Sequence, residues 1–334
     1  MYFYTMSNIK ISLLELATIC KGSNATEAIG RAVKGAQYIE ELGFHRIWLA
    51  EHHNMPHIAS SATAVLIGHI AGQTKHIRVG SGGIMLPNHT PLVIAEQFGT
   101  LESIYPERID LGLGRAPGTD QLTAMALRRN NLNTSFYFKE DILELQQYLD
   151  ENNFNAKVRA FPGEGLDIPI YILGSSTDSA YLAAELGLPY AFAAHFAPAM
   201  LDQAMEIYHA RFKPSDMLKE PYTIICINIV AGDSVEEAQF LSTSLFNMFA
   251  GILTNLRKPL SPPTEKPIYH GIPEIEQAVQ NMVNCTFIGT EKEIRQDVLA
   301  FAEKHRANEI MTTNYIFDEG KRLHAFDIIA KALM

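Results

Sequence analysis

Short apolar segments alternate regularly with segments of helical spacing along this chain, and this pattern leaves few possible folds. The apolar segments are rich in Ile, Val and Leu nearly throughout, as expected for parallel strands that are covered on both faces. They predict strands at 9–16, 46–52, 77–86, 108–115, 169–175, 189–196, 223–232 and 309–316. Helices are predicted at about 25–43, 60–74, 91–105, 139–150, 177–187, 199–212, 234–250 and 290–305, with a last helix closing the chain. Eight such units in 334 residues favour a (β/α)8 TIM barrel, of class α/β, over an open doubly wound sheet.

Two stretches do not fit the alternation and are predicted to be insertions, near 151–168 and 251–289. The first is polar and carries Gly and Pro, whereas the second begins Pro-rich (KPLSPPTEKP) and then becomes apparently helical. Neither stretch is typical of a boundary between domains. We therefore expect a single domain over residues 1–334.

Composition narrows the classes of partner. The formal net charge of -10 argues against a nucleic-acid or anionic-membrane partner, because both require positive patches. The three cysteines, Cys20, Cys226 and Cys285, form no CxxC pair, so neither a disulfide framework nor a zinc ribbon is expected, and a reducing cytoplasm fits. The start MYFYTMSNIK has no apolar core of signal-peptide length, no run of about 18 apolar residues occurs anywhere, and Met6 is an alternative first residue. We therefore expect a cytoplasmic protein that binds neither nucleic acid nor membranes.

The candidate site lies where the predicted strands end, because TIM barrels carry their functional groups at the C-terminal ends of the strands. Polar residues and glycines collect at these positions. In chain order they are Glu51, His52 and His53; Ser81, Gly82, Gly83, Asn88 and His89; Gly112, Gly114 and Arg115; Gly174, Ser175, Ser176 and Thr177; His195; and Thr313, Asn314 and Tyr315. Polar residues gathered at one end of the barrel are what a single pocket there would require.

A metal site is the first alternative, because His53 and His57 are four residues apart, like a helical zinc pair. Pro56 lies between them and would break or kink a helix that carried both. No third ligand has matching spacing. We therefore expect no metal, and we expect His53 and His57 to be solvated loop histidines.

The glycine-rich segments allow several interpretations. GLGRAPG (112–118) lacks the spacing of a dinucleotide fingerprint, and a proline follows where a helix should open. Its glycines allow a flat ligand to lie against the backbone while Arg115 supplies charge, or the segment is an ordinary turn with Arg115 in a salt bridge. Gly82 and Gly83 weaken their strand unless something approaches closely. A planar ring, an unusual peptide geometry or a bulge without a ligand would each account for them.

The turn GSSTDSAYLAAELG (174–187) places small hydroxyl residues directly before a helix. The free amides of a helix N-terminus together with the hydroxyls of Ser175 and Ser176 form an anion site that suits a phosphate. Arg115 on a neighbouring strand strengthens this interpretation, since a guanidinium commonly completes such a site. The alternative is that one of these hydroxyls only caps the helix.

These motifs together resemble those of a known family. WLAEHHN (48–54), the run from GSGG to GLGRAPG (80–118) and the turn GSS before a helix are similar to the bacterial luciferase-like flavin monooxygenases. The resemblance covers nearly the whole chain. It is closest to the uncharacterised YhbW-like branch, in which AEHHN, GSGG, GLGRAPG and CINI occur together.

The resemblance implies a TIM barrel, often dimeric, that binds FMN at the C-terminal ends of its strands. His52 matches a histidine that acts in proton transfer near the reactive flavin edge. Gly82 and Gly83 match a non-proline cis peptide beneath the isoalloxazine ring. The FMN phosphate is expected at Arg115, Ser175 and Ser176.

Two neighbouring positions bear on these roles. Glu51 and His53 are expected either to orient His52 or only to be solvated at the rim of the pocket. Gly114 stands where the light-emitting enzymes of the family have a reactive cysteine, so light emission is not expected.

The resemblance implies an FMN-dependent monooxygenase that uses reduced flavin and O₂ to oxygenate a small organic substrate. No nicotinamide fingerprint is present, so a separate flavin reductase is the expected source of reduced FMN. A homodimer is the expected assembly. Three alternatives stay open: a deazaflavin-dependent enzyme that transfers hydride without O₂, a flavin-binding protein without turnover, and a metal hydrolase.

Overall fold

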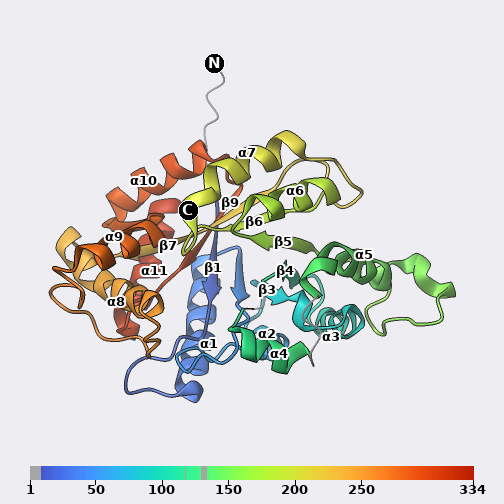
Figure 1. Ribbon diagram of the computed structural model, residues 1–334, viewed down its shortest axis with the longest axis horizontal. Helices are drawn as coiled ribbons and strands as arrows, with labels where there is room; N and C mark the ends of the chain where they lie inside the picture. Colours follow the sequence, from blue (N-terminus) through green and yellow to red (C-terminus); the bar gives the residue numbers. More distant parts are fainter. Residues whose placement is uncertain (1–8, 117, 129–133) are drawn as a thin grey trace.

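The computed structural model describes residues 9–116, 118–128 and 134–334 of the chain. Eight parallel strands in this part of the chain close into a barrel, in the order β1-β2-β3-β4-β5-β6-β7-β9 and back to β1. Helices surround the barrel (Figure 1). The predicted (β/α)8 TIM barrel is therefore confirmed.

The elements follow the predicted alternation closely. The strands are β1 Lys10–Glu15, β2 Arg46–Leu49, β3 Arg78–Met85, β4 Ile109–Gly114, β5 Ile170–Gly174, β6 Tyr190–Ala193, β7 Thr223–Ala231, β8 Thr286–Gly289 and β9 Glu309–Thr313. The helices are α1 Ala25–Leu42, α2 Thr63–Gln73, α3 Pro91–Ile104, α4 Gln121–Arg128, α5 Phe138–Leu149, α6 Thr177–Leu186, α7 Leu201–Arg211, α8 Val235–Leu253, α9 Pro273–Met282, α10 Glu291–Lys304 and α11 Glu319–Leu333. None of these described helices has the length and apolar character needed to cross a membrane.

Local chemistry explains where the helices begin and end. Helix α1 starts at a capping box, in which the Asn24 side chain accepts from the Glu27 backbone and the Glu27 side chain accepts from the Asn24 backbone. It ends at Gly43, whose φ of 86° lies in the left-handed region that glycine adopts without a Cβ clash. Signals within a few residues therefore set these boundaries.

The insertion at 251–289 contains α9, as expected, and also a strand that the sequence did not predict. Strand β8 pairs in parallel with residues 228–231 of β7, whereas β9 pairs with residues 224–228. The C-terminal half of β7 therefore leaves the barrel and forms a ribbon with β8. Helices α8 and α9 lie beside this ribbon, at one side of the barrel (Figure 1).

The insertion at 151–168 contains a short 3-10 helix, Glu151–Asn155, and packs against α3. A Cβ on Gly99 of α3 would lie 2.2 Å from the Cα of Gly163, so glycine is required where the two segments cross. Helix α4 is a further element that the sequence did not predict. It lies between β4 and α5, next to the 3-10 helix η1, Leu86–Asn88, that follows β3.

Charged residues fill the N-terminal end of the barrel. Arg46 of β2 pairs with Asp110 at 2.7 Å and with Glu309 at 2.9 Å, and Arg78 pairs with Asp110 at 2.6 Å. Trp48 donates its indole N–H to Asp110 at 3.0 Å. Two guanidinium groups thus neutralise two fully buried carboxylates. The network lies at the end of the barrel that contributes to stability rather than to catalysis.

Candidate active site

His52 follows β2 and lines an apolar cavity of about 180 Å³ at the C-terminal ends of the strands. Its backbone N–H donates to the Ser60 carbonyl at 2.9 Å. The hydroxyls of Ser60 and Thr63 both donate to the Ala50 carbonyl. The turn after β2 is therefore fixed by side chains at the start of α2, and His52 is held in a defined position.

The cavity wall is mostly methionine, phenylalanine, leucine and isoleucine, with three histidines among them. His52 and His57 come from the turn after β2, and His195 comes from the end of β6. In each of the three rings, Nδ1 is buried and has no hydrogen-bond partner among the described residues. These nitrogens are unpartnered but enclosed, so a ligand in the cavity would reach them only if the rings turned.

Burial keeps these imidazoles neutral. It lowers the pKa of His52, although a hydrogen bond to the Gly118 carbonyl opposes this effect. Burial, with a smaller contribution from His52 nearby, lowers the pKa of His195 to about 3. The pKa of His57 is also lowered, by burial first and by the positive charge of Arg257 second. The three rings are therefore uncharged near neutral pH.

Glu51 is fully buried and ties β2 to the segment after β3. Its carboxylate accepts hydrogen bonds from the Met85 backbone N–H at 3.0 Å, Asn88 Nδ2 at 3.1 Å, His53 Nε2 at 2.9 Å and His89 Nε2 at 3.0 Å. Burial alone would raise the pKa of Glu51, but the bonds from His53, His89 and Asn88 outweigh it and lower the pKa to about 2.

Solvation at the rim is therefore wrong for Glu51, whereas a role of Glu51 and His53 in orienting His52 stays a prediction. Glu51 is 1% exposed and so is not solvated at the rim, and His53 bonds to Glu51. No hydrogen bond links either residue to the His52 ring within the described part of the chain.

The expectation of a solvated His57 is also wrong. The residue is 3% exposed, because the turn after β2 folds back over the end of β1. The Ile19 N–H donates to the His57 carbonyl at 2.9 Å, and Thr18 forms a β-bridge with Ile58. His53 is partly buried through its bond to Glu51. In residues 9–116, 118–128 and 134–334, no group of three or more His, Cys, Asp and Glu side chains is placed to hold a metal ion.

The Gly82–Gly83 peptide bond is cis, as the resemblance predicted. The register between β3 and β4 shifts at this point, so Gly83 is also the extra residue of a bulge. A Cβ on Gly82 would lie 2.6 Å from Leu14 Cδ1, and one on Gly83 would lie 2.7 Å from the Gly112 carbonyl oxygen. Packing inside the barrel thus requires both glycines, and the approach of a planar ring stays a prediction.

Arg115, Ser175 and Ser176 are brought together at the ends of β4 and β5, which pair in the sheet. Arg115 Nη2 lies 3.2 Å from Asp178 Oδ2 in the first turn of α6. Ser176 occupies the N-cap position of α6, but its hydroxyl makes no capping hydrogen bond. The capping interpretation is therefore wrong for Ser176, and its hydroxyl is available to a ligand.

The Arg115–Asp178 pair means that the salt-bridge interpretation of Arg115 is correct in part. Both side chains are about half exposed or more, so the pair contributes little and is readily exchanged for a stronger anion. The carboxylate of Asp178 opposes a bound phosphate, while the guanidinium and the amides of α6 favour it.

Comparison with known proteins identifies the family. The sequence model described as luciferase-like monooxygenase matches residues 9–307. The chain belongs to this family. It is 50% identical to the uncharacterised protein YvbT of Bacillus subtilis (strain 168) over 321 residues, which are 96% of this chain and 95% of YvbT. It is 48% identical to a luciferase-like monooxygenase of Escherichia coli (strain K12) over 324 residues, 97% of each chain.

A solved structure agrees with this assignment. The crystal structure of apo-MsnO8 superimposes with a TM-score of 0.89 at 29% identity, covering 98% of this chain and 99% of that one. As a member of the luciferase-like monooxygenase family, the protein is a flavin-dependent oxidoreductase. The roles of individual residues and membership of the YhbW-like branch stay predictions.

Gly114 is the position at which the resemblance implies a difference from the light-emitting enzymes. A Cβ on Gly114 would lie 2.9 Å from Met85 Sδ. The thioether of Met85 thus occupies the space into which a cysteine side chain would project. The two positions are linked, because a larger residue at 114 requires Met85 to move.

His195 and Asn228 link neighbouring strands at the cavity, a role that the sequence analysis does not predict. The sequence shows His195 only as the end of a strand and Asn228 only as part of CINI. Asn228 Nδ2 donates to the His195 carbonyl at 2.7 Å, and the Thr313 hydroxyl donates to Asn228 Oδ1. The sequence feature that could have indicated this role is one amide side chain, Asn228, within an otherwise apolar strand. A buried amide needs hydrogen-bond partners, and here neighbouring strands must supply them.

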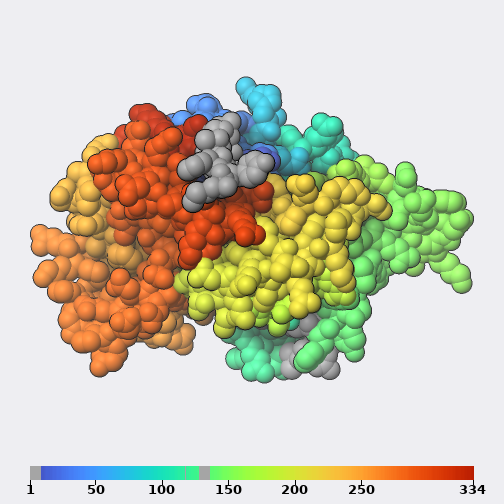
Figure 2. All heavy atoms as spheres, turned by 90° about the horizontal axis from the view of Figure 1, so that it is seen from above, coloured from blue at the N-terminus to red at the C-terminus, as the bar shows by residue number. Residues whose placement is uncertain are grey.

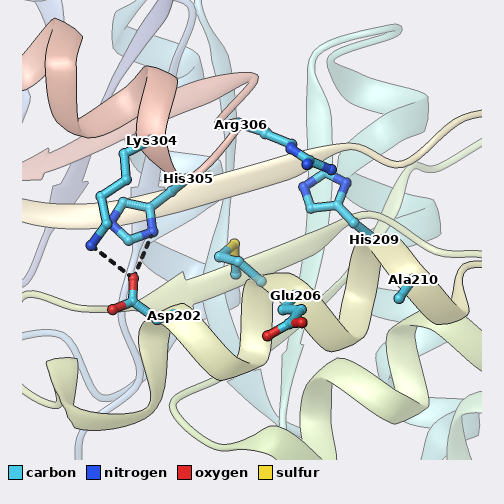
Figure 3. Close-up of a pocket in the computed structure, with 8 residues that line it drawn as sticks. Asp202, Glu206, His209, Ala210, Lys304, His305 and Arg306 are labelled. Carbon is cyan, nitrogen blue, oxygen red and sulfur yellow. Dashed lines mark hydrogen bonds and ion pairs between the residues drawn. The ribbon is translucent and has the colours of Figure 1, made fainter.

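A second depression, of about 380 Å³, lies outside the barrel between α7 and the end of α10 (Figure 3). The two helices lie side by side on the face seen in Figure 2. Asp202 accepts from Lys304 at 3.0 Å and lies 3.4 Å from His305 Nδ1, so charges in this depression neutralise one another (Figure 3). It is remote from the C-terminal ends of the strands and is not the candidate active site.

Proposed function

We propose that the protein is an FMN-dependent monooxygenase that uses reduced flavin and O₂ to oxygenate a small organic substrate. The observation that carries the proposal is His52, a neutral imidazole on the wall of an apolar cavity at the C-terminal ends of the strands. The chain surrounding it has the features that a flavin needs: a guanidinium, a free serine hydroxyl and the amides of α6 for the phosphate, beside a glycine-lined strand.

The protein groups would divide the work as follows. Arg115, Ser175 and Ser176 hold the phosphate, and the backbone at Gly82 and Gly83 supports the ring. Bound reduced FMN supplies the electrons with which O₂ is activated. His52 would take up or return a proton at a ring nitrogen during the reaction, a role that imidazoles commonly have in enzymes. The apolar wall excludes water from the reacting groups.

Named relatives support the proposal in general terms. The N-acetyl-S-alkylcysteine monooxygenase of Bacillus subtilis is 40% identical over 189 residues, 55% of this chain and 57% of that one. The oxygenating constituent of 3,6-diketocamphane monooxygenase from Pseudomonas putida, solved with FMN, has the same fold at 15% identity with a TM-score of 0.74.

A hydride-transferring enzyme that uses a deazaflavin is the second candidate. An F420-dependent secondary alcohol dehydrogenase has the same fold with a TM-score of 0.71, at 14% identity. At 14% and 15% identity, the likeness to this enzyme and the likeness to the FMN complex each show the fold alone. The two candidate functions differ in their cofactor, so measuring whether the protein binds FMN or F420 decides between them.

The test is retention of flavin by the purified protein, followed by its absorption spectrum after excess FMN is removed. We expect oxidised or reduced FMN to be retained, and Arg115→Gln to weaken its binding about tenfold, the effect of losing one charge-assisted contact. Arg211→Gln is the matched control, since Arg211 is exposed at the end of α7. Retention of F420 but of neither form of FMN would overturn the proposal.

A second measurement addresses the source of electrons. The protein loaded with FMN should oxidise NADH and NADPH only slowly on its own, and an added flavin reductase should restore O₂ consumption. Rapid oxidation of either nucleotide without a reductase would contradict the need for a separate partner.

A further inference from the structure

Arg257 is an unpaired cation on the lining of the candidate active-site cavity. It lies four residues beyond the end of α8, on an exposed segment, and makes no hydrogen bond or ion pair within the described part of the chain. The segment is anchored on both sides. Leu256 N–H donates to the Gly251 carbonyl at 2.7 Å, and Leu260 N–H donates to the Ile19 carbonyl at 2.9 Å. Backbone bonds on either side of Arg257 thus hold the segment that carries it beside the cavity.

Arg257 is also the one full charge among the described residues that line the cavity. The three histidines are held neutral by burial, and the lining contains no carboxylate. The effect of Arg257 on the pKa of His57 shows that its charge reaches the buried part of the wall. A protein with a net charge of -10 therefore presents a positive entrance to an apolar cavity.

The remaining lining residues indicate what kind of molecule would carry an anionic group into the cavity. Met55, Met248 and Met282 line it together with Phe196 and Phe249. Thioethers and aromatic rings adapt to apolar bodies of varied shape. A cavity of about 150 Å³ holds benzene, so a volume of about 180 Å³ suits an apolar body of roughly six carbons.

We propose that the substrate is an apolar carboxylate, which Arg257 binds by its carboxyl group while its apolar body fills the cavity beside His52. This assignment rests on the proposed function and adds the substrate class to it. His57 lies on the same wall, but its Nδ1 is buried, so Arg257 is the polar group on which the assignment of a carboxylate rests. Binding the charged group at the entrance leaves the far end of the body for the reaction.

The test compares two probes of nearly equal shape, phenylacetate and phenylacetamide, by isothermal titration calorimetry at low salt. We expect phenylacetate to bind the FMN-loaded protein about tenfold more tightly than phenylacetamide, as one charge-assisted contact would give. Arg257→Gln should reduce this ratio to about one. Lys258→Gln, which removes the neighbouring exposed cation, should leave the ratio unchanged.

The titration is repeated on protein without FMN, so that failure of the two proposals can be told apart. Absence of FMN binding would remove the proposed function, yet the preference for phenylacetate and its loss in Arg257→Gln would still be measured. Equal binding of the two probes, no binding of either, or a preference that survives Arg257→Gln would overturn the role of Arg257 whatever the flavin result.

Discussion

Replacing Glu51 by glutamine tests whether one buried carboxylate joins the two strand ends that carry the site. The carboxylate accepts bonds from four donors on two segments and has almost no exposed surface. Glutamine has the same shape, but its amide nitrogen would face donors where the carboxylate presents an acceptor. At least one buried donor would lose its partner.

The magnitude follows from the pKa of Glu51. Folding lowers this pKa from its usual 4.5 to about 2. At about 1.4 kcal/mol per pKa unit, the ionised carboxylate stabilises the folded state by about 3 kcal/mol at neutral pH. We therefore expect Glu51→Gln to lower the free energy of unfolding by about 3 kcal/mol. Glu41→Gln, at an exposed position of α1, should change it by less than about 0.5 kcal/mol.

The pH dependence gives an independent check of the same reasoning. Because the pKa is lower in the folded state, the stabilisation is complete above about pH 4.5 and is lost as the pH falls toward 2. The difference between wild type and Glu51→Gln should be constant from pH 6 to 8. It should narrow by about 1 kcal/mol at pH 3.5. Urea unfolding followed by circular dichroism measures both quantities, and a variant within 0.5 kcal/mol of wild type at pH 7 would refute the argument.

Two further predictions concern buried charge. Arg46→Met should lower the free energy of unfolding by about 3–5 kcal/mol, because Glu309 and one oxygen of Asp110 lose a buried partner. A loss below about 1 kcal/mol, measured by denaturant unfolding, would contradict this prediction. His195→Asn should weaken the dependence of stability on pH. Burial lowers the pKa of His195 to about 3, so wild type loses stability as the pH falls from about 6.5 toward 3, at up to about 1.4 kcal/mol per pH unit. The free energy of unfolding, measured at pH 7.5 and at pH 5, should fall less in His195→Asn than in wild type. The control is His76→Asn, at an exposed position, which should behave like wild type. The same fall in His195→Asn and wild type would refute the role of burial.

Much of the fold was predictable because it depends on local patterns. The apolar runs and helical spacing gave all eight barrel strands, since each signal lies within one segment. Strand β8 was missed because TFIG is short and follows a helix inside an insertion. Only its pairing with the protruding half of β7 makes it a strand.

The candidate site was predictable in its position but not in its interactions. The sequence indicated that His52, Arg115, Ser175 and Ser176 would lie at one end of the barrel. The cis peptide at Gly82–Gly83 came from the resemblance to a family, because nothing in the residue pattern distinguished it from a simple bulge.

The order of strands and helices, and the residues at the strand ends, follow from spacing along the chain and can be read from it directly. The burial of His57, the bonds from Glu51 to the segment after β3 and the position of Arg257 at the cavity arise only in the folded chain. These properties depend on contacts between segments tens to hundreds of residues apart. The free energy of a charge or an imidazole is set by the atoms around it, and barrel closure brings those atoms together.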